Sequence, residues 1–177
     1  MKVRRFYCDT LLNNAYKVLM VVTLIAIALV TTPFVNAEFS PKIQRPMLVY
    51  KSPTCGCCGA WVDHMNQADF TTKIQHPSNM NTIKDQLGIS PVYEACHTAA
   101  HSGYVFEGHI PADIIKHFLA KKPDALGLAV PGMPMGSPGM DLGGAFNPYQ
   151  VLQLNKDGSS TPYAKVSASN TIYLGNN

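Results

Sequence analysis

Strand-like and helix-like spacings of apolar residues alternate along residues 47–130 and predict a small mixed sheet with helices packed on it. The first apolar run ends at Pro53, because proline cannot continue a strand ladder. Trp61 and Met65, four positions apart, give the next segment the apolar face of a helix. The predicted elements are a strand over 47–51, a helix over 58–68, a strand over 71–75, a helix from Ser78 or Asn79 to Gly88, a hairpin of strands 96–99 and 104–107, and a helix from Pro111 to Pro123.

The remainder of the chain has a weaker pattern. An apolar run over 126–130 is followed by a segment rich in Gly, Pro and Met over 131–140. A second hairpin is predicted from strands 151–154 and 163–166, joined by the turn Lys156-Asp157-Gly158. Residues 47–166 are long enough for one domain with its own core, and residues 167–177 are expected to form a C-terminal tail.

The N-terminal segment has the pattern of a secretory signal peptide. Basic residues precede an uncharged apolar run, Val18–Val30, which is shorter than the ~20 residues that a membrane-spanning helix needs. Val35-Asn36-Ala37 predicts cleavage after Ala37, so that residues 1–37 are removed and residues 38–46 form a polar lead-in. The alternative is an uncleaved membrane anchor. In either case the remainder is exported, and after cleavage we expect a periplasmic protein without a membrane segment.

The charge pattern does not indicate a nucleic-acid partner. The net charge of +3 comes from the leader, so residues 38–177 carry equal numbers of basic and acidic side chains. The sequence has no basic stripe with interleaved aromatic residues, which is the usual footprint of nucleic-acid binding.

Three cysteines, Cys55, Cys57 and Cys58, lie where the first strand gives way to the first helix. The N-terminus of a helix favours the thiolate, which is the form that attacks disulfides and binds soft metals. Cys55 and Cys58 form a C-x-x-C between a strand and a helix, which is typical of thioredoxin-like redox domains. The predicted fold is therefore α/β: a thioredoxin-like mixed sheet with flanking helices and a C-terminal β-hairpin.

The cysteine count leaves the pairing open. Cys8 is lost with the leader, and Cys96 is the fourth cysteine of the exported part. Four exported cysteines ordinarily predict two disulfides. If Cys55 pairs with Cys58, however, Cys57 must reach Cys96 or stay free, and shared coordination of a metal resolves this conflict. The alternative for Cys96 is a buried small apolar side chain.

Methionine and histidine supply further candidate ligands. Thioether sulfur is a ligand that suits Cu(I). Segment 131–140 is not expected to form a helix, so its methionines are not expected to be core residues. We expect this segment to fold over the cysteines, with Met133 and Met135 as stronger candidate ligands than Met140. His97 and His109 are candidate ligands or hydrogen-bonded structural imidazoles. The other histidines are not expected to bind metal: His64 on the first helix, and His76, His101 and His117 on the surface.

Several segments resemble the DUF411 family: YKSPTCGCCGAWVDHM, ACHTA, GYVFEGHIPADIIKHFL and GLAVPGMPMGSPGM, within a match from about Leu48 to Val166. This family comprises exported metal-binding proteins, including a copper-resistance protein. The resemblance implies a thioredoxin-like fold and periplasmic copper handling. The implied copper ligands are the thiolates of Cys55, Cys57, Cys58 and Cys96, supported by His97, His109, Met133 and Met135. One departure is Ala100-His101-Ser102, where His101 is either a surface substitution or an extra ligand.

Three functions are consistent with these features. The first is a periplasmic copper-binding protein of copper resistance or homeostasis that holds Cu(I), with a copper cluster and Cu(I)/Cu(II) interconversion as further hypotheses and other periplasmic copper-handling proteins as partners. The second is a thiol–disulfide oxidoreductase in which Cys55 attacks and Cys58 resolves. The third is a structural zinc or disulfide domain that binds another protein, although the paired C-x₂-C spacing of zinc knuckles is absent.

Overall fold

A computed structural model describes residues 45–141, 143 and 146–174. The predicted leader and most of the lead-in lie outside the described residues. The elements are β1 (Met47–Lys51), α2 (Gly56–Gln67), β2 (Thr72–Gln75), α3 (Met80–Gln86), the 3-10 turn η1 (Pro91–Tyr93), β3 (His97–His101), β4 (Tyr104–Glu107), α4 (Ala112–Lys121), β5 (Gly127–Ala129), β6 (Tyr149–Leu154), β7 (Ser160–Val166) and β8 (Thr171–Tyr173).

The strands form one mixed sheet of eight strands in the order β2-β1-β3-β4-β5-β6-β7-β8. β1 pairs with β2 in parallel and with β3 antiparallel, and β4 pairs with β3 antiparallel and with β5 in parallel. The predicted mixed α/β fold is confirmed, and the arrangement of the first four strands is consistent with the thioredoxin-like prediction. The predicted C-terminal hairpin is β6–β7, which extends the same sheet beyond β5.

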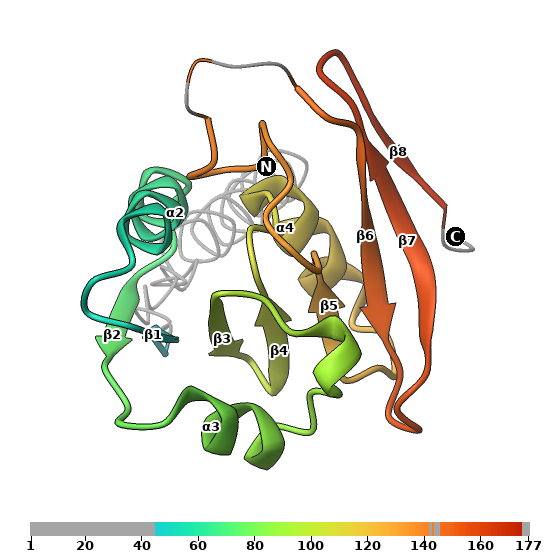
Figure 1. Ribbon diagram of the computed structural model, residues 1–177. Helices are drawn as coiled ribbons and strands as arrows, with labels where there is room; N and C mark the ends of the chain where they lie inside the picture. Colours follow the sequence, from blue (N-terminus) through green and yellow to red (C-terminus); the bar gives the residue numbers. More distant parts are fainter. Residues whose placement is uncertain (1–44, 142, 144–145, 175–177) are drawn as a thin grey trace, which may run out of the picture. The chain divides into compact units, whose positions relative to one another are not determined.

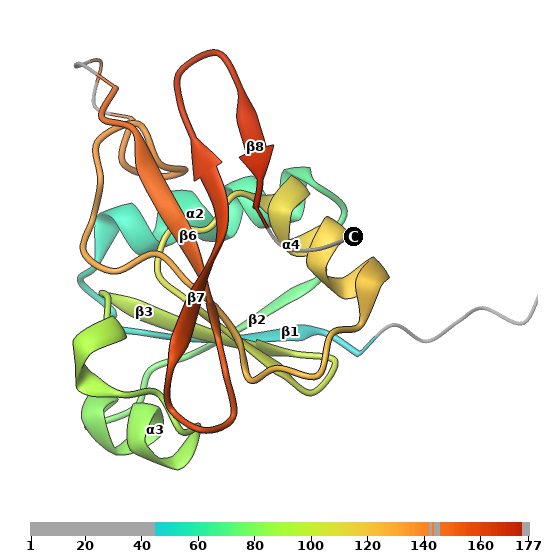
Figure 2. The same cartoon turned by 90° about the vertical axis from the view of Figure 1, so that its right-hand side faces the viewer.

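Helices cover both faces of the sheet around its first strands. α2 and α4 lie on one face and α3 on the other (Figures 1 and 2). Successive side chains of β4 point to opposite faces of the sheet and so contribute to two hydrophobic clusters. Phe106 belongs to the cluster under α2 and α4, and Val105 belongs to a smaller cluster with Ile89 and Leu154. Side chains at the ends of the central strands can therefore reach either layer.

The boundaries of α2 and β3 differ from the sequence prediction. α2 begins at Gly56 rather than Cys58, because Cys55 is already the N-cap and its carbonyl accepts the Gly59 N–H at 3.3 Å. β3 continues beyond Ala99 to His101, since its pairing with β4 runs up to the turn. Strand periodicity turns His101 toward the same face as Ala99, and it is 9% exposed, which corrects the surface prediction for this residue.

The predicted C-terminal tail contains a strand. β8 pairs antiparallel with β7. Its Tyr173 ring stacks on His117 of α4 with centroids 4.0 Å apart, and His117 Nδ1 lies 2.7 Å from the Tyr163 hydroxyl of β7. Residues 171–173 are thus part of the sheet, and His117 is half-buried beneath them rather than on the surface.

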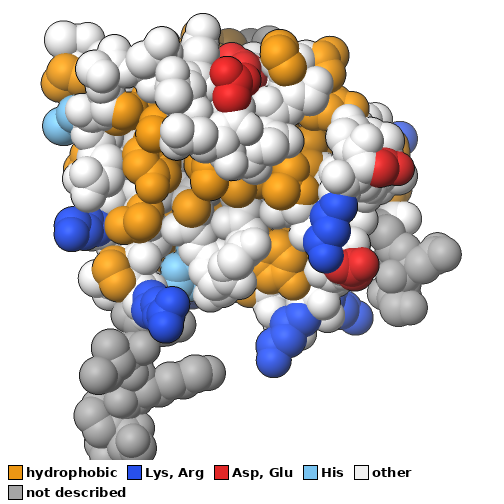
Figure 3. Space-filling view, turned by 90° about the horizontal axis from the view of Figure 1, so that it is seen from below, with side chains coloured by type: hydrophobic (Ala, Val, Ile, Leu, Met, Phe, Trp, Pro, Cys, Tyr) orange, Lys and Arg blue, Asp and Glu red, His pale blue; other side chains and the backbone are white. Residues whose placement is uncertain are grey.

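No helix among the described residues is long and apolar enough to cross a membrane. The face seen from below in Figure 3 has apolar side chains across much of its middle, and its Lys and Arg side chains lie apart from one another. This view includes no continuous basic stripe among the described residues drawn there.

Candidate metal centre

The cysteine triplet lies at the junction of β1 and α2. The chain turns after Lys51 through Ser52-Pro53-Thr54, and the Ser52 carbonyl accepts the Cys55 N–H at 3.2 Å. Cys55 then caps the helix in an extended conformation, and Cys57 and Cys58 occupy its first turn. Cys58 is fully buried, whereas Cys55 and Cys57 are half-buried, so that the triplet has an inner and an outer side.

Cys55 and Cys58 form a disulfide, with Cα atoms 5.4 Å apart. Cys57 and Cys96 are free. The sulfur of Cys57 lies 3.5 Å from that of Cys55. At this distance the Cys57 thiolate could attack Cys55, which would form a Cys55–Cys57 disulfide and release Cys58 as the thiolate. Of the pairings considered from the sequence, this structure has the one that leaves Cys57 unpaired.

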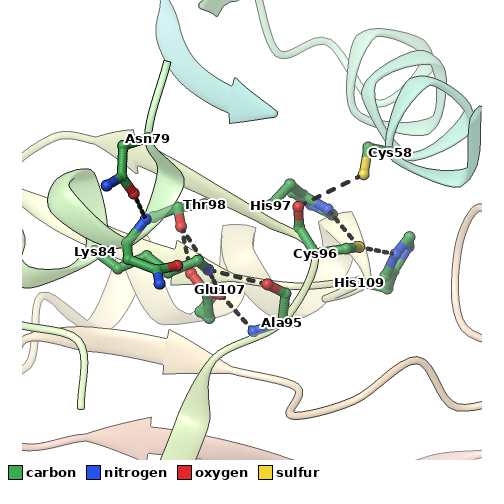
Figure 4. Close-up of polar contacts among 10 residues, drawn as sticks. Cys58, Asn79, Lys84, Ala95, Cys96, His97, Thr98, Glu107 and His109 are labelled. Atoms are coloured by element: carbon green, nitrogen blue, oxygen red, sulfur yellow. Dashed lines mark hydrogen bonds and ion pairs between the residues drawn. The ribbon is translucent and has the colours of Figure 1, made fainter. Parts of the chain in front are cut away.

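Cys96 approaches the triplet from the start of β3. The ligand atoms of Cys55, Cys57, Cys58 and Cys96 all lie within 4.8 Å of one another. The sulfur of Cys58 also lies 3.9 Å from the Cys96 carbonyl oxygen, as Figure 4 shows. The sulfurs of residues far apart in the sequence are thus gathered in one place, and Cys96 is half-buried beside them rather than a core side chain.

A second set of ligand atoms overlaps the first at Cys96. The ligand atoms of Cys96, His97 and His109 also lie within 4.8 Å of one another. The Cys96 sulfur is 3.0 Å from His109 Nε2 and 3.5 Å from His97 Nδ1 (Figure 4). Cys96 is therefore the shared corner of a four-sulfur set and a set of one sulfur and two imidazoles.

The tautomer of His109 follows from its hydrogen bonds. Its Nδ1 lies 2.8 Å from the Pro138 carbonyl oxygen, which can only accept, so Nδ1 carries the proton. Nε2 then has the free electron pair and accepts from the Cys96 thiol. A backbone carbonyl that orients an imidazole in this way is the usual outer partner of a histidine that binds metal.

His97 is fully buried between two rings. Its centroid lies 4.4 Å from that of Trp61 and 4.9 Å from that of His109. Its Nε2 is buried without a hydrogen-bond partner among the described residues. An unsatisfied buried nitrogen costs free energy, so Nε2 has spare hydrogen-bonding or ligand capacity, whereas Nδ1 is the ring nitrogen that lies near the Cys96 sulfur, at 3.5 Å.

Burial keeps these groups neutral in the metal-free protein. Burial, and then the nearby Cys57, raises the pKa of the Cys96 thiol to about 12. Burial lowers the pKa of His109, and burial followed by the charges of His109 and Lys84 lowers that of His97 well below its usual value. Neutral imidazoles have the free electron pair that a metal needs, and a soft metal would displace the Cys96 proton.

An ion pair on the other face of the sheet fixes the backbone beside Cys96. Glu107 is fully buried and pairs with Lys84 of α3, which is 3% exposed. The Glu107 carboxylate also accepts the Ala95 N–H at 2.6 Å and the Thr98 hydroxyl at 2.5 Å. Lys84 donates to the Ala95 carbonyl at 3.0 Å, so the pair holds both backbone polar groups of the residue before Cys96 (Figure 4).

Segment 131–140 closes over the triplet at Gly139. A Cβ at this position would lie 2.5 Å from the Cys57 carbonyl oxygen and 2.9 Å from the Trp61 nitrogen, so only glycine allows this approach. Gly139 and Asp141 line an open depression with Gly56, Cys57 and Ala60. The side chain of Met133 is 51% exposed and that of Met135 is half-buried, so their role as ligands stays a prediction.

Sequence reasoning missed three polar residues around the site. Lys51, Lys84 and Glu107 are 6%, 3% and 0% exposed. The strand period could have predicted the burial of Lys51, because Lys51 lies two residues after Val49 and four after Met47, on the same buried face of β1. His64 was placed on the first helix without a role, and its Nε2 accepts the Ala112 N–H at 3.0 Å at the start of α4.

Comparison with known proteins agrees with the sequence resemblance. The family model described as "Protein of unknown function, DUF411" matches residues 93–140. A solved structure named "Copper resistance protein copG- Form 1" is 35% identical, with a TM-score of 0.65, over 70% of this chain and 98% of that chain. This chain belongs to the DUF411 family. A second solved structure, "Copper resistance protein copG- Form 2", is 36% identical, with a TM-score of 0.64, over 69% of this chain and 98% of that chain.

A search of curated protein sequences returned no significant match. The DUF411 model covers the part of the chain that contains Cys96, His97, His109 and segment 131–140. The solved structures share the fold over nearly their whole length, so the assignment rests on the architecture as well as on the motifs.

Proposed function

We propose that this DUF411 protein is a copper-binding protein of copper resistance or homeostasis that holds Cu(I) through Cys55, Cys57, Cys58 and Cys96. The carrying observation is that the four sulfur ligand atoms lie within 4.8 Å of one another. Thiolate is a soft ligand that favours Cu(I), Zn²⁺ and Fe–S clusters over hard cations, so the sulfur set narrows the metal to these. The names of the two similar solved structures support copper as the metal.

The overlap of the two ligand sets at Cys96 supports a site for more than one copper ion. A shared thiolate can bridge two ions, and the second set adds the imidazoles of His97 and His109. Sulfur favours Cu(I), whereas imidazole also suits Cu(II), so a mixed set supports interconversion of the two oxidation states. Met133 and Met135 would add thioether ligands when segment 131–140 closes further over the triplet.

The Cys55–Cys58 disulfide makes copper loading depend on redox state. Among the cysteines of the described residues, Cys57 and Cys96 are the thiols and Cys55 and Cys58 share the disulfide. Two electrons and two protons from a dithiol reductant convert the disulfide into two thiols, and Cu(I) then replaces the thiol protons. We therefore expect the copper capacity of the protein to rise on reduction.

Export is part of the proposal and rests on the sequence of residues 1–37. A periplasmic location fits a disulfide between Cys55 and Cys58, since such bonds persist in oxidising compartments. The proposed partners are other periplasmic copper-handling proteins that deliver or remove the metal at the open side of the triplet near Cys57 and Gly139.

Anaerobic Cu(I) titration of the reduced protein tests the proposal. The wild type is expected to bind tightly, and Cys57→Ser is expected to lower the stoichiometry or affinity while the fold, followed by circular dichroism, is retained. Unchanged binding in Cys57→Ser would contradict a site built on the triplet. Metal analysis of protein from copper-fed cells distinguishes copper from the zinc of the structural alternative.

The disulfide itself favours a second candidate, a thiol–disulfide oxidoreductase. Cys55 is the helix N-cap and the more exposed sulfur of the pair, which are the features of an attacking thiolate. Insulin reduction by the metal-free protein tests this activity. Turnover that survives Cys57→Ser and disappears in Cys55→Ser would favour the oxidoreductase over copper storage.

A further inference from the structure

Lys51 is a buried lysine without a carboxylate partner. It ends β1 and its side chain is 6% exposed. Within the described ranges, no carboxylate lies in ion-pair distance of its ammonium, whereas the other buried lysine, Lys84, is paired with Glu107. A lysine is almost never buried without a partner, because the loss of hydration is costly. The contrast between the two lysines calls for a different counter-charge at Lys51.

The Lys51 ammonium lies beside the cysteine turn. It donates to the Ser52 carbonyl at 2.8 Å, and the same oxygen accepts the Cys55 N–H at 3.2 Å. Lys51 is also the register partner of His97 across β1 and β3. Residues directly opposite in an antiparallel pair project from the same face of the sheet, so the Lys51 and His97 side chains are neighbours on the face that α2 covers.

The neighbouring sulfurs carry no charge in the disulfide and thiol form but become anionic with metal. Each cysteine that binds Cu(I) loses its proton, and four thiolates that hold fewer than four monovalent ions have a net negative charge. Glu107, the buried carboxylate nearby, is already neutralised by Lys84. The Lys51 ammonium is thus an unmatched buried cation next to a site that gains negative charge on loading.

We propose that Lys51 is the counter-charge of the metal-loaded cysteine site, a positioning residue that stabilises the anionic copper–thiolate form without binding copper. This inference rests on the proposed function. The buried charge of Lys51 destabilises the metal-free protein, where the ammonium has no counter-charge. The same charge stabilises the copper-loaded protein, because the thiolates form only then. Removal of the charge is therefore expected to affect the stability of the metal-free and the loaded protein in opposite directions.

The test compares Lys51→Gln, Lys51→Met and Lys51→Arg with the wild type, all expressed as the full chain, purified and reduced. Cu(I) affinity is measured by competition with a colorimetric Cu(I) chelator at low and at high salt. Loss of the charge in the Gln and Met variants is expected to weaken binding about tenfold to a hundredfold, the order expected for one partly buried unit charge. The Arg variant is expected to keep most of the affinity.

Two further readouts separate charge from structure. The metal-free Met variant is expected to melt at or above the wild-type temperature, because a costly buried charge is removed. The loss of affinity is expected to persist at high salt, since buried charges are weakly screened. Lys165→Met removes an exposed lysine of β7 and is the matched control, with unchanged affinity expected at high salt.

The outcomes distinguish the two proposals. A wild type that binds Cu(I) tightly, together with Gln and Met variants that bind equally well, overturns the role of Lys51 and leaves the copper function standing. Metal-free Gln and Met variants that both unfold or melt well below the wild type assign Lys51 a structural role and also overturn it. A wild type that does not bind Cu(I) overturns the proposed function and this inference together.

Discussion

The Nε2 of His109 faces the Cys96 sulfur at 3.0 Å because its Nδ1–H is held by the Pro138 carbonyl at 2.8 Å. The imidazole is thus oriented before any metal arrives, and its free electron pair points at a sulfur that belongs to both ligand sets. The same hydrogen bond ties segment 131–140 to the site. Orientation of His109 and closure of the segment are therefore parts of one arrangement.

His109→Ala is expected to lower Cu(I) affinity by at least the ten- to hundredfold that loss of an outer partner of a metal ligand costs. Competition titration measures the affinity. Quenching of Trp61 fluorescence gives a second reading, because Trp61 is the only tryptophan and its ring lies 4.4 Å from His97. His117→Ala removes a histidine that belongs to neither ligand set and is the control. Equal affinities in the two variants would exclude His109 from the site.

Lys84→Met is expected to destabilise the protein by about 3–5 kcal/mol, because it leaves the buried Glu107 carboxylate uncompensated. Burial already raises the pKa of Glu107, and the Lys84 ammonium is the main opposing influence. Urea unfolding of the metal-free protein measures the change. The double variant Lys84→Met/Glu107→Gln keeps an acceptor for the Ala95 N–H without a buried charge, so it is expected to recover much of the loss. A double variant no more stable than Lys84→Met would mean that the ion pair is not the source of the effect.

Local signals were sufficient to predict the first half of the fold and the cysteine site. Pro53 marked the end of β1, the Trp61–Met65 spacing marked α2, and the triplet between them indicated the candidate metal site. The start of α2 was placed two residues late because a cysteine at an N-cap has no propensity signal of its own. The residue pattern already made Cys96, His97 and His109 candidate ligands, and the family resemblance supported them as partners of the triplet, which spacing alone left open.

The buried charges and the last strand could not be predicted in the same way. The Lys84–Glu107 pair joins residues on α3 and β4, and no local pattern indicates that the two meet. β8 is short, and it is held by the stacking of Tyr173 on His117 of α4, a contact between distant segments. Tertiary contacts of this kind override local propensity.

Stability is expected to fall as the pH drops below about 6.5, in part through His64. Its Nε2 accepts the Ala112 N–H at 3.0 Å, where the N-cap Pro111 offers no side-chain cap. Burial lowers the pKa of His64 below the usual histidine value of 6.5, and Asp113 opposes the shift. The unfolded chain therefore takes up the proton first. The cap's contribution is full above pH 6.5 and is lost as the pH falls through the folded-state pKa.

His64→Ala is expected to cost about 1 kcal/mol at pH 8, the usual loss for a helix cap. Urea unfolding at pH 8, 7, 6 and 5.5 measures the difference from the wild type. The stability difference is expected to shrink toward pH 5.5, because only the wild type loses stability when His64 is protonated in the unfolded chain. Other histidines with lowered pKa, such as His101, contribute equally to both proteins and cancel. A difference that is constant across this range would contradict a neutral-imidazole cap.

Gly139→Ala is expected to open the contact between segment 131–140 and the cysteine helix. The added Cβ would lie 2.5 Å from the Cys57 carbonyl oxygen, a backbone atom that cannot move without α2. Because φ at Gly139 is +83°, the substitution also carries the cost of a left-handed conformation, about 1–2 kcal/mol. Both stability and Cu(I) affinity should therefore decrease.

Gly158→Ala separates these two effects. Gly158 has the same φ of +83°, and an added Cβ there meets nothing within 4 Å. It should lose stability by the conformational cost alone and keep the wild-type Cu(I) affinity. Urea unfolding and chelator competition on both variants give the comparison. If Gly139→Ala behaved like Gly158→Ala in both measurements, the close approach at Cys57 would have no part in metal binding, and Met133 and Met135 would lose their route to the sulfurs.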